Sequence, residues 1–346
     1  MFKKLVALLI LCVMCFSACS SETPVINEES SDKPSSSSEP VEQPKTSVNP
    51  LTGEDTLPLG KDKDRPVAVM INNISIAQKV QTGVAAADIV YETEVEGGIT
   101  RLMAVYQDIT KVPQIGSVRS ARYPYVDLAL GHDAIYVHCG EDPLYCKPHL
   151  KDIDHISIDS NLKGAKRIPN GLATEHTLYG LGADLWSTLV SKFRSEKKEI
   201  TPWQTFAQDK NTIALSDGTA QKVSLSFTNS YNTEFTFDSN SKTYIRSVKE
   251  EVRKDYVTGE TTAITNLFIL KTNISNYPDN YHRKVELDSG EGYYITNGTY
   301  EKIKWSKGAS TNGITFTDVA GNKLKLNQGK SWVCFINNSR PEPTFQ

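Results

Sequence analysis

The C-terminal part of the chain alternates short apolar segments with turn sequences, a pattern that leaves room for little except β-strands. Residues 222–228 form one such segment. The segments 252–257 and 263–270 flank Thr258-Gly259-Glu260, and a further hairpin is expected around Gly321-Asn322, a pair typical of tight β-turns. We therefore expect a β-rich domain from about residue 209 to the C-terminus.

Residues 65–205 instead mix two kinds of periodicity. Buried strands are expected at 65–71 and 133–138, whereas apolar residues recur at helical spacing over 120–130 and 181–193. A length of 346 residues suggests about two domains. The predicted fold class is therefore α+β, with an N-terminal mixed α/β-sheet domain over residues 49–208 and a C-terminal β-rich domain over residues 209–346.

The first 18 residues have the character of a bacterial lipoprotein signal peptide. Two lysines precede an apolar run of 12 residues, Leu5 to Phe16, which is shorter than the ~20 residues that a spanning helix needs. The run ends in Ser17-Ala18-Cys19, which resembles a lipobox, so we expect acylation of Cys19 and attachment to the outer face of the cytoplasmic membrane. An ordinary secretory signal with an incidental cysteine is the alternative.

Residues 19–48 are expected to be a disordered acidic linker. Residues 20–48 contain nine serines, four prolines and five glutamates, too little apolar surface to form a core. Loss of Lys3 and Lys4 with the signal peptide changes the net charge from −3 to −5, because 36 basic residues then face 41 acidic ones. This balance argues against nucleic acid as a partner and leaves the acyl group as the membrane attachment.

The segment from Asp88 to Tyr106 carries the strongest local signal for a site. It reads as two strands joined at Gly97-Gly98, and a two-residue loop would pair Glu96 with Ile99. Side-chain alternation would then gather one apolar face and one charged face. The charged face would hold Glu92, Glu94, Glu96 and Arg101. A solvated outer face is the simplest interpretation; a glycosidase is the alternative, since i and i+2 carboxylates stand ~6.5–7 Å apart.

Arg119 and Arg122 lie three residues apart at the predicted start of the 120–130 helix, so their side chains would share a face. Two guanidinium groups beside a helix N-terminus favour a phosphate or carboxylate ligand. An internal salt bridge to the glutamate face is equally compatible with the pattern. We therefore treat both arginines as candidate ligand-binding residues.

His138 ends a predicted buried strand, and His176 and Tyr179 lie in a loop-like segment. Strand ends and loops are where sites on a rigid scaffold gather, although a lone histidine is more often structural. Adjacent strand residues point to opposite faces, so His138 and Cys139 make a poor thiol–base pair. A disulfide between Cys139 and Cys146 is compatible with the sequence. We expect no metal or cofactor, since no phosphate loop, dinucleotide fingerprint or zinc-protease motif occurs.

Several of these segments together resemble the YerB-like lipoprotein family. The resemblance rests on five motifs: 65–70 with Asn73, 87–92, 95–101, 118–122 and 136–138 with the His176/Tyr179 pair. The motifs 305–307 and 329–332 extend it into the second domain, so that it spans about residues 49–346. The resemblance implies a bacterial lipoprotein with an α+β domain followed by a β-rich domain. It does not indicate which reaction, if any, the protein catalyses. Ser117 and Cys139-Gly140-Glu141 depart from the family pattern, which weakens any essential role for Cys139.

The leading hypothesis is a membrane-anchored extracytoplasmic binding or accessory protein for an anionic cell-envelope ligand, such as a cell-wall glycan, teichoic acid or peptide. A wall-acting hydrolase that uses glutamate and histidine as acid and base is one alternative, and a protein–protein docking module is another. The candidate ligand-binding residues are Glu92, Glu96, Arg101, Arg119, Arg122, His138, His176 and Tyr179.

Overall fold

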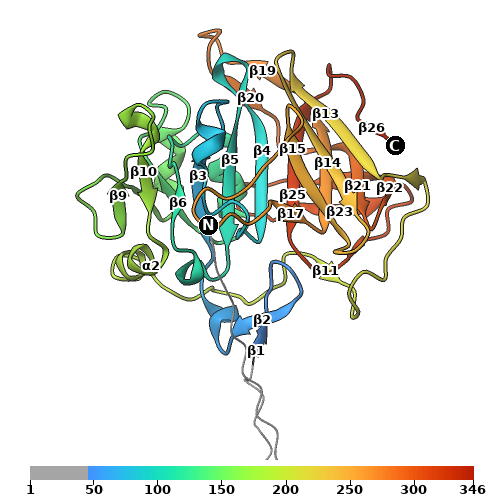
Figure 1. Cartoon of the computed structure of the whole chain (residues 1–346), viewed down its shortest axis with the longest axis horizontal. Helices are drawn as coiled ribbons and strands as arrows, with labels where there is room; N and C mark the ends of the chain where they lie inside the picture. Colours follow the sequence, from blue (N-terminus) through green and yellow to red (C-terminus); the bar gives the residue numbers. More distant parts are fainter. Residues whose placement is uncertain (1–45) are drawn as a thin grey trace, which may run out of the picture. The chain divides into compact units, whose positions relative to one another are not determined.

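The computed structural model describes residues 46–346, so the predicted signal peptide and Cys19 lie outside the described residues. An eleven-stranded sheet forms the centre of the fold (Figure 1). Its strands, in spatial order, are β12 (Gly218–Thr219), β22 (Thr299–Ser306), β21 (Ser289–Thr296), β18 (Asn266–Thr272), β25 (Ser331–Asn337), β4 (Ile89–Val95), β5 (Ile99–Tyr106), β3 (Val67–Asn72), β7 (Ile135–His138) and β8 (His155–Ser157), with β23 (Thr315–Asp318) paired to β22.

A six-stranded antiparallel sheet covers part of one face of this central sheet. Its strand β13 contacts β4, β5 and β25, and apolar side chains from both sheets form a shared core between them (Figure 1). The strands of this second sheet are β16 (Glu251–Val252), β15 (Thr243–Val248), β14 (Tyr231–Asp238), β13 (Lys222–Thr228), β26 (Thr344–Phe345) and β17 (Ala263–Ile264).

Four smaller groups of strands complete the β structure: the hairpin β1 (Thr46–Val48) with β2 (Asp55–Pro58), the trio β6 (Ile115–Gly116), β10 (Leu178–Gly180) and β9 (Ala165–Arg167), the parallel pair β11 (Thr205–Phe206) and β24 (Lys325–Leu326), and the hairpin β19 (Ile274–Asn276) with β20 (Arg283–Val285). Two α-helices occur in the described part of the chain, α1 (Tyr123–Leu130) and α2 (Gly182–Val190). The protein is therefore mostly β, with less helix than the predicted α+β class implies. None of the helices between residues 46 and 346 is long and apolar enough to cross a membrane.

The two halves of the chain meet in the middle of the central sheet. β4, from the first half, pairs in parallel with β25, from the last residues of the second half, with Ser331 opposite Ile89. Strands from both sides of residue 208 thus share one hydrogen-bonded sheet, and residues 45–346 form one compact unit. The boundary at 208/209 stays a prediction, but residues 46–48, assigned to the linker, form β1 instead.

The orientation of the strands places several carboxyl ends at one edge. β18, β25 and β4 run parallel, and β3 and β7 run parallel to them because β5 lies antiparallel between β4 and β3. In sheets with parallel strands, ligands commonly bind outside the carboxyl ends. The glutamates of β4, Asn72 and Asn73 at the end of β3, and His138 at the end of β7 all lie toward this edge.

The register of the β4–β5 hairpin differs from the prediction by one residue. Val95 pairs with Ile99 and Thr93 with Arg101, because Glu96 joins the two glycines in a three-residue loop. A slip of one residue moves every side chain of one strand to the other face. Arg101 therefore lies on the opposite face from Glu92. The predicted solvated outer face is also wrong, since all seven residues of β4 are buried.

Candidate functional site

Each of the three glutamates around the β4–β5 turn is buried and has an arginine partner. Their exposed fractions are 0 %, 5 % and 6 % for Glu92, Glu94 and Glu96. The pairs are Glu92 with Arg246, Glu94 with Arg283, and Glu96 with Arg122. Arg246 and Arg283 come from the second half of the chain, so no local sequence signal could have identified them as partners.

Glu92 is sealed inside the core between the two sheets. Its Oε1 accepts hydrogen bonds from Asn73 Nδ2 (2.9 Å) and Thr100 Oγ1 (2.7 Å), and its Oε2 accepts one from Trp332 Nε1 (3.1 Å). The guanidinium of Arg246 lies 3.6 Å from Oε2 and 4.6 Å from the centre of the Trp332 ring. A carboxylate enclosed in this way has no access to a polymer substrate, so Glu92 does not fit the acid–base role considered for it.

Glu96 and Arg122 form the ion pair nearest the turn. Arg122 Nε donates to both carboxylate oxygens, at 2.8 and 2.9 Å, and its NH1 donates to the Ala121 carbonyl at 2.8 Å. Arg122 directly precedes α1, with extended backbone angles, and Pro124 stands in the first turn of that helix. The predicted helix thus begins at Tyr123 rather than at residue 120, and Arg119 lies outside it.

Arg101 differs from the other buried arginines because it has no carboxylate partner among residues 46–346. Its side chain is 7 % exposed, and its NH1 donates to the Ser120 carbonyl at 2.7 Å. Burial first, and then the positive charge of Arg122, lowers the pKa of Arg101 to about 10; Glu96 and Tyr125 oppose this shift, and Arg119 adds a smaller effect in the same direction as Arg122. The guanidinium therefore stays protonated at neutral pH, with no carboxylate in direct contact among residues 46–346.

Arg119 belongs to an extended segment, residues 117–121, that crosses the carboxyl ends of β3 and β7. Its backbone N–H donates to the Met70 carbonyl, and its carbonyl accepts from Cys139 N–H, both at 3.0 Å. The side chain reaches Glu175, with NH1 3.3 Å from the carbonyl and NH2 3.4 Å from Oε1. Because the segment's backbone is hydrogen-bonded on both sides, it forms a rigid support for the arginine.

His138 is held by hydrogen bonds at both ring nitrogens. Nδ1 donates to the Gly140 carbonyl at 2.8 Å, which leaves Nε2 to accept from His155 Nδ1 at 2.9 Å. Burial lowers the pKa of His138 to about 4. A neutral imidazole with both nitrogens occupied is a structural group here, so the geometry does not favour His138 as a general base.

His176 and Tyr179 have different hydrogen-bond partners. His176 accepts from Asn72 Nδ2 at Nδ1 (2.9 Å), and its Nε2 is 3.2 Å from Glu175 Oε1, the atom that Arg119 also contacts. The Tyr179 hydroxyl donates to the Val80 carbonyl (3.1 Å) and accepts from Asn170. The structure thus groups Arg101, Arg119, Arg122, Glu96 and His176, which we call the arginine cluster. It places Glu92 elsewhere and leaves the Tyr179 hydroxyl in internal hydrogen bonds.

The cysteines and carboxylates offer little further chemistry. Cys139, Cys146 and Cys334 are free thiols, so residues 139 and 146 form no disulfide. Burial raises the pKa of Cys139 and raises that of Cys146 to about 12, which disfavours a thiolate nucleophile. No group of three histidine, cysteine or acidic side chains is arranged to hold a metal within residues 46–346.

Comparison with known proteins places this architecture in a family. Residues 51–196 match the model for the N-terminal domain of a protein of unknown function, DUF3048, and residues 222–333 match the model for its C-terminal domain. The chain is 29 % identical over 302 residues to a Bacillus subtilis (strain 168) protein named "Putative lipoprotein YerB", covering 83 % of this chain and 85 % of that protein. The crystal structure of YerB from Bacillus subtilis matches with a TM-score of 0.72 at 27 % identity, covering 83 % of this chain and 95 % of that one. The chain belongs to the YerB-like (DUF3048) family.

Proposed function

We propose that this chain is a membrane-anchored, extracytoplasmic binding or accessory lipoprotein that captures an anionic cell-envelope ligand at the arginine cluster. The observation that carries the proposal is the unpaired charge of Arg101. Every glutamate near it has an arginine of its own, and Arg101 has only a backbone carbonyl. The anchor would be the acyl group on Cys19. The similarity of the chain to a protein named as a putative lipoprotein supports attachment to the membrane.

A buried charge without a partner is costly, and a bound anion would offset that cost. Removing an ion from water without a counter-charge costs several kcal/mol even after the protein relaxes. Arg122 and Arg119 repel the charge of Arg101, and Glu96, which opposes them, is itself hydrogen-bonded to Arg122. An incoming phosphate or carboxylate would reverse both effects, since guanidinium groups bind such oxygens bidentately.

The chemistry of the cluster selects the ligand class. Arg119, with a side chain 25 % exposed, gives access from solvent, whereas Arg122 and Arg101 lie deeper. Teichoic-acid phosphates and the carboxylates of wall glycans or peptides are the anions that a protein on the outer face of the membrane would meet. Because Nδ1 of His176 accepts from Asn72, its Nε2 carries the hydrogen and would supply a further hydrogen-bond donor beside Glu175.

Isothermal titration with inorganic phosphate, glycerol phosphate and a muramyl peptide tests this proposal. We expect saturable binding of at least one probe by the wild type. In Arg101→Gln and Arg119→Ala, the affinity should fall at least tenfold, equivalent to about 1.4 kcal/mol.

Arg194→Gln is the matched control for this titration, because Arg194 is an exposed arginine that pairs with Asp133 before the amino end of β7. Its affinity should equal that of the wild type. No binding of any probe, or an equal loss in the control, would refute the proposal.

A further inference from the structure

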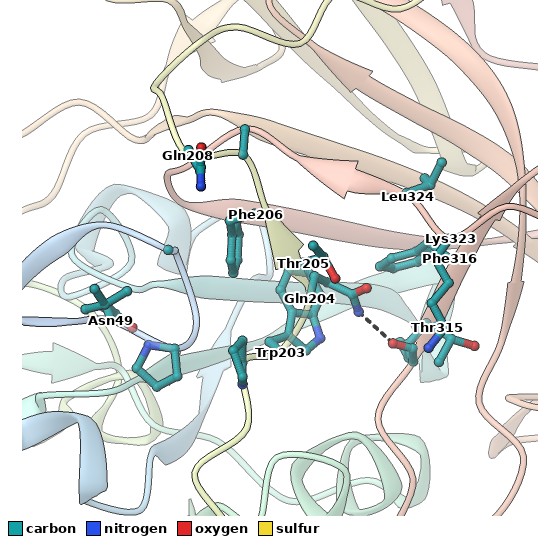
Figure 2. A pocket seen from close by; sticks show the side chains of 16 residues that line it. Asn49, Trp203, Gln204, Thr205, Phe206, Gln208, Thr315, Phe316, Lys323 and Leu324 are labelled. Atoms are coloured by element: carbon teal, nitrogen blue, oxygen red, sulfur yellow. Dashed lines mark hydrogen bonds between the residues drawn. The ribbon is translucent and has the colours of Figure 1, made fainter.

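A second concave site lies at the other end of β4, away from the arginine cluster. The groove has a volume of about 510 Å³ and opens between the β1–β2 loop, β11 and β23 (Figure 2). Asn49, which lines it, donates to the carboxylate of Asp88, the residue before β4. Volumes of ~300–1,000 Å³ are typical of small-molecule sites.

Two aromatic side chains give the groove a preformed apolar wall. Trp203 is half-buried and packs edge-on against Phe268 and Phe316, at ring-centre distances of 6.1 and 6.0 Å. Phe206 lies against Gly53, where a Cβ would come within 2.4 Å of the Phe206 ring, and Gly53 has a φ of +73°. The chain thus fixes the position of both rings before any ligand arrives.

The polar groups around these rings are amides and hydroxyls rather than acids. Gln204, Gln208 and Thr205 come from the same segment as the two aromatic rings, and Figure 2 shows them around the opening. No carboxylate lines the groove, and Lys323 is its one charged side chain. This lining has no preference for cations and supplies hydrogen bonds that an acyl chain could not use.

The orientation of Trp203 further narrows the chemical class of ligand that the groove could bind. Its indole nitrogen is buried and has no hydrogen-bond partner among the described residues, so the part of the ring that lines the groove is hydrocarbon. An indole used in this way offers a stacking surface rather than a donor for a peptide carbonyl. Sugar rings combine a C–H face for such a surface with hydroxyls that amide side chains can bind.

We propose that the groove around Trp203 is a saccharide-binding site, independent of the arginine cluster. A neighbouring cavity of about 750 Å³ shares Trp203, Pro202, Ile314 and Thr315 with it. Trp203 therefore lies where two cavities meet, an arrangement that fits a sugar chain better than a single ring. A protein anchored near the cell wall would use this site to hold a glycan strand.

Titration of the mature chain with chitotetraose and maltotetraose tests the site by tryptophan fluorescence and calorimetry. Of the four tryptophans, Trp305 and Trp332 are buried, so a change in emission reports on Trp203 or Trp186. We expect saturable binding of at least one tetrasaccharide with a change in emission. Binding should weaken at least tenfold in Trp203→Ala and in Phe206→Ala, two partly buried residues of the groove wall.

Two variants serve as controls. Trp186→Ala removes the other half-buried tryptophan, a residue of α2 that lies under the ammonium group of Lys61, and Arg101→Gln removes a residue proposed to bind the anion. Both should bind the saccharide as the wild type does. The proposal is overturned if neither tetrasaccharide binds, if Trp203→Ala and Phe206→Ala bind normally, or if a proline-rich peptide or a lipid vesicle occupies the groove instead.

Discussion

The Glu92 carboxylate is the most completely enclosed charge among the residues discussed, and its surroundings explain why it is tolerated. Three neutral donors and Arg246 share its two oxygens. The sequence alone shows that three glutamates cluster at residues 92–96. Arg246, which faces Glu92, stands 154 residues later in the chain. Only the packing of the second sheet brings Arg246 there, so pattern-based prediction could not find it.

Removing one partner of this pair should destabilise the protein strongly. Arg246→Met leaves Glu92 charged and buried, and we expect a loss of about 3–5 kcal/mol in the free energy of unfolding by urea. Glu286→Gln is the matched control, since Glu286 forms an exposed pair with Lys284 at 3.9 Å and should change stability by less than about 0.5 kcal/mol. A similar small loss in both variants would show that the buried pair is not what stabilises this core.

Two buried histidines make stability depend on pH. Burial lowers the pKa of His138 to about 4 and that of His132 to about 3, below the unfolded value of about 6.5. Between those values the unfolded chain binds protons that the folded chain does not, so stability falls as pH falls below about 6.5, by about 1.4 kcal/mol per pH unit for each histidine. Urea unfolding at pH 7 and pH 5 should show this loss, and His138→Asn should reduce its slope. A slope unchanged by the substitution would contradict the assignment.

Strands were easier to predict than the way they pair. The segments 222–228 and 65–71 are strands within a residue or two of the prediction. The β4–β5 register was wrong because the loop contains Glu96 as well as the two glycines, and burial of both faces of β4 leaves no alternation of polar and apolar residues to reveal the difference. The predicted strand 252–257 ends at Val252, because the Asp255 carboxylate accepts from the N–H groups of Val257 (2.9 Å) and Thr258 (3.0 Å) and turns the chain.

The β19–β20 hairpin is an element whose attachment can be tested alone. Tyr277, between its strands, stacks on Tyr145 with ring centres 3.7 Å apart, and Arg283 of β20 pairs with Glu94. An aromatic pair contributes about 0.5–1.5 kcal/mol, so Tyr277→Ala should speed amide exchange in residues 274–285 by up to about tenfold. Tyr281→Ala, which removes a side chain 60 % exposed in the same hairpin, should leave exchange unchanged. Equal rates in the two variants would contradict a role for the stack.

At the scale of the whole molecule, the central sheet joins the two sequence halves. The prediction of two successive domains rested on a change in periodicity, which reports local structure and not which strands become neighbours. The parallel pairing of β4 with β25 depends on contacts across some 240 residues, and no local pattern encodes it. The match to the first family model ends at residue 196, and the match to the second begins at residue 222. Residue 208 therefore lies between two matched sequence regions, although strands from both regions share one sheet.

One shared sheet predicts one unfolding transition. Urea unfolding followed by far-UV circular dichroism and by tryptophan fluorescence should give coincident curves, because Trp332 on β25 packs against both sheets. Two separated transitions would instead indicate that the halves are independent folding units, despite their shared strands.

The central claim is that Arg101 is kept unpaired for a ligand, and the stability of Arg101→Met tests it most directly. If the charge serves a ligand, its removal should leave the ligand-free protein within about 1 kcal/mol of the wild type, or more stable, since only the hydrogen bond to Ser120 is lost. Saturating phosphate or glycerol phosphate, at 100 times its Kd, should stabilise the wild type by about 2.7 kcal/mol and the variant far less. A variant that is destabilised by about 3 kcal/mol without ligand, or that gains as much from the anion as the wild type, would contradict the claim.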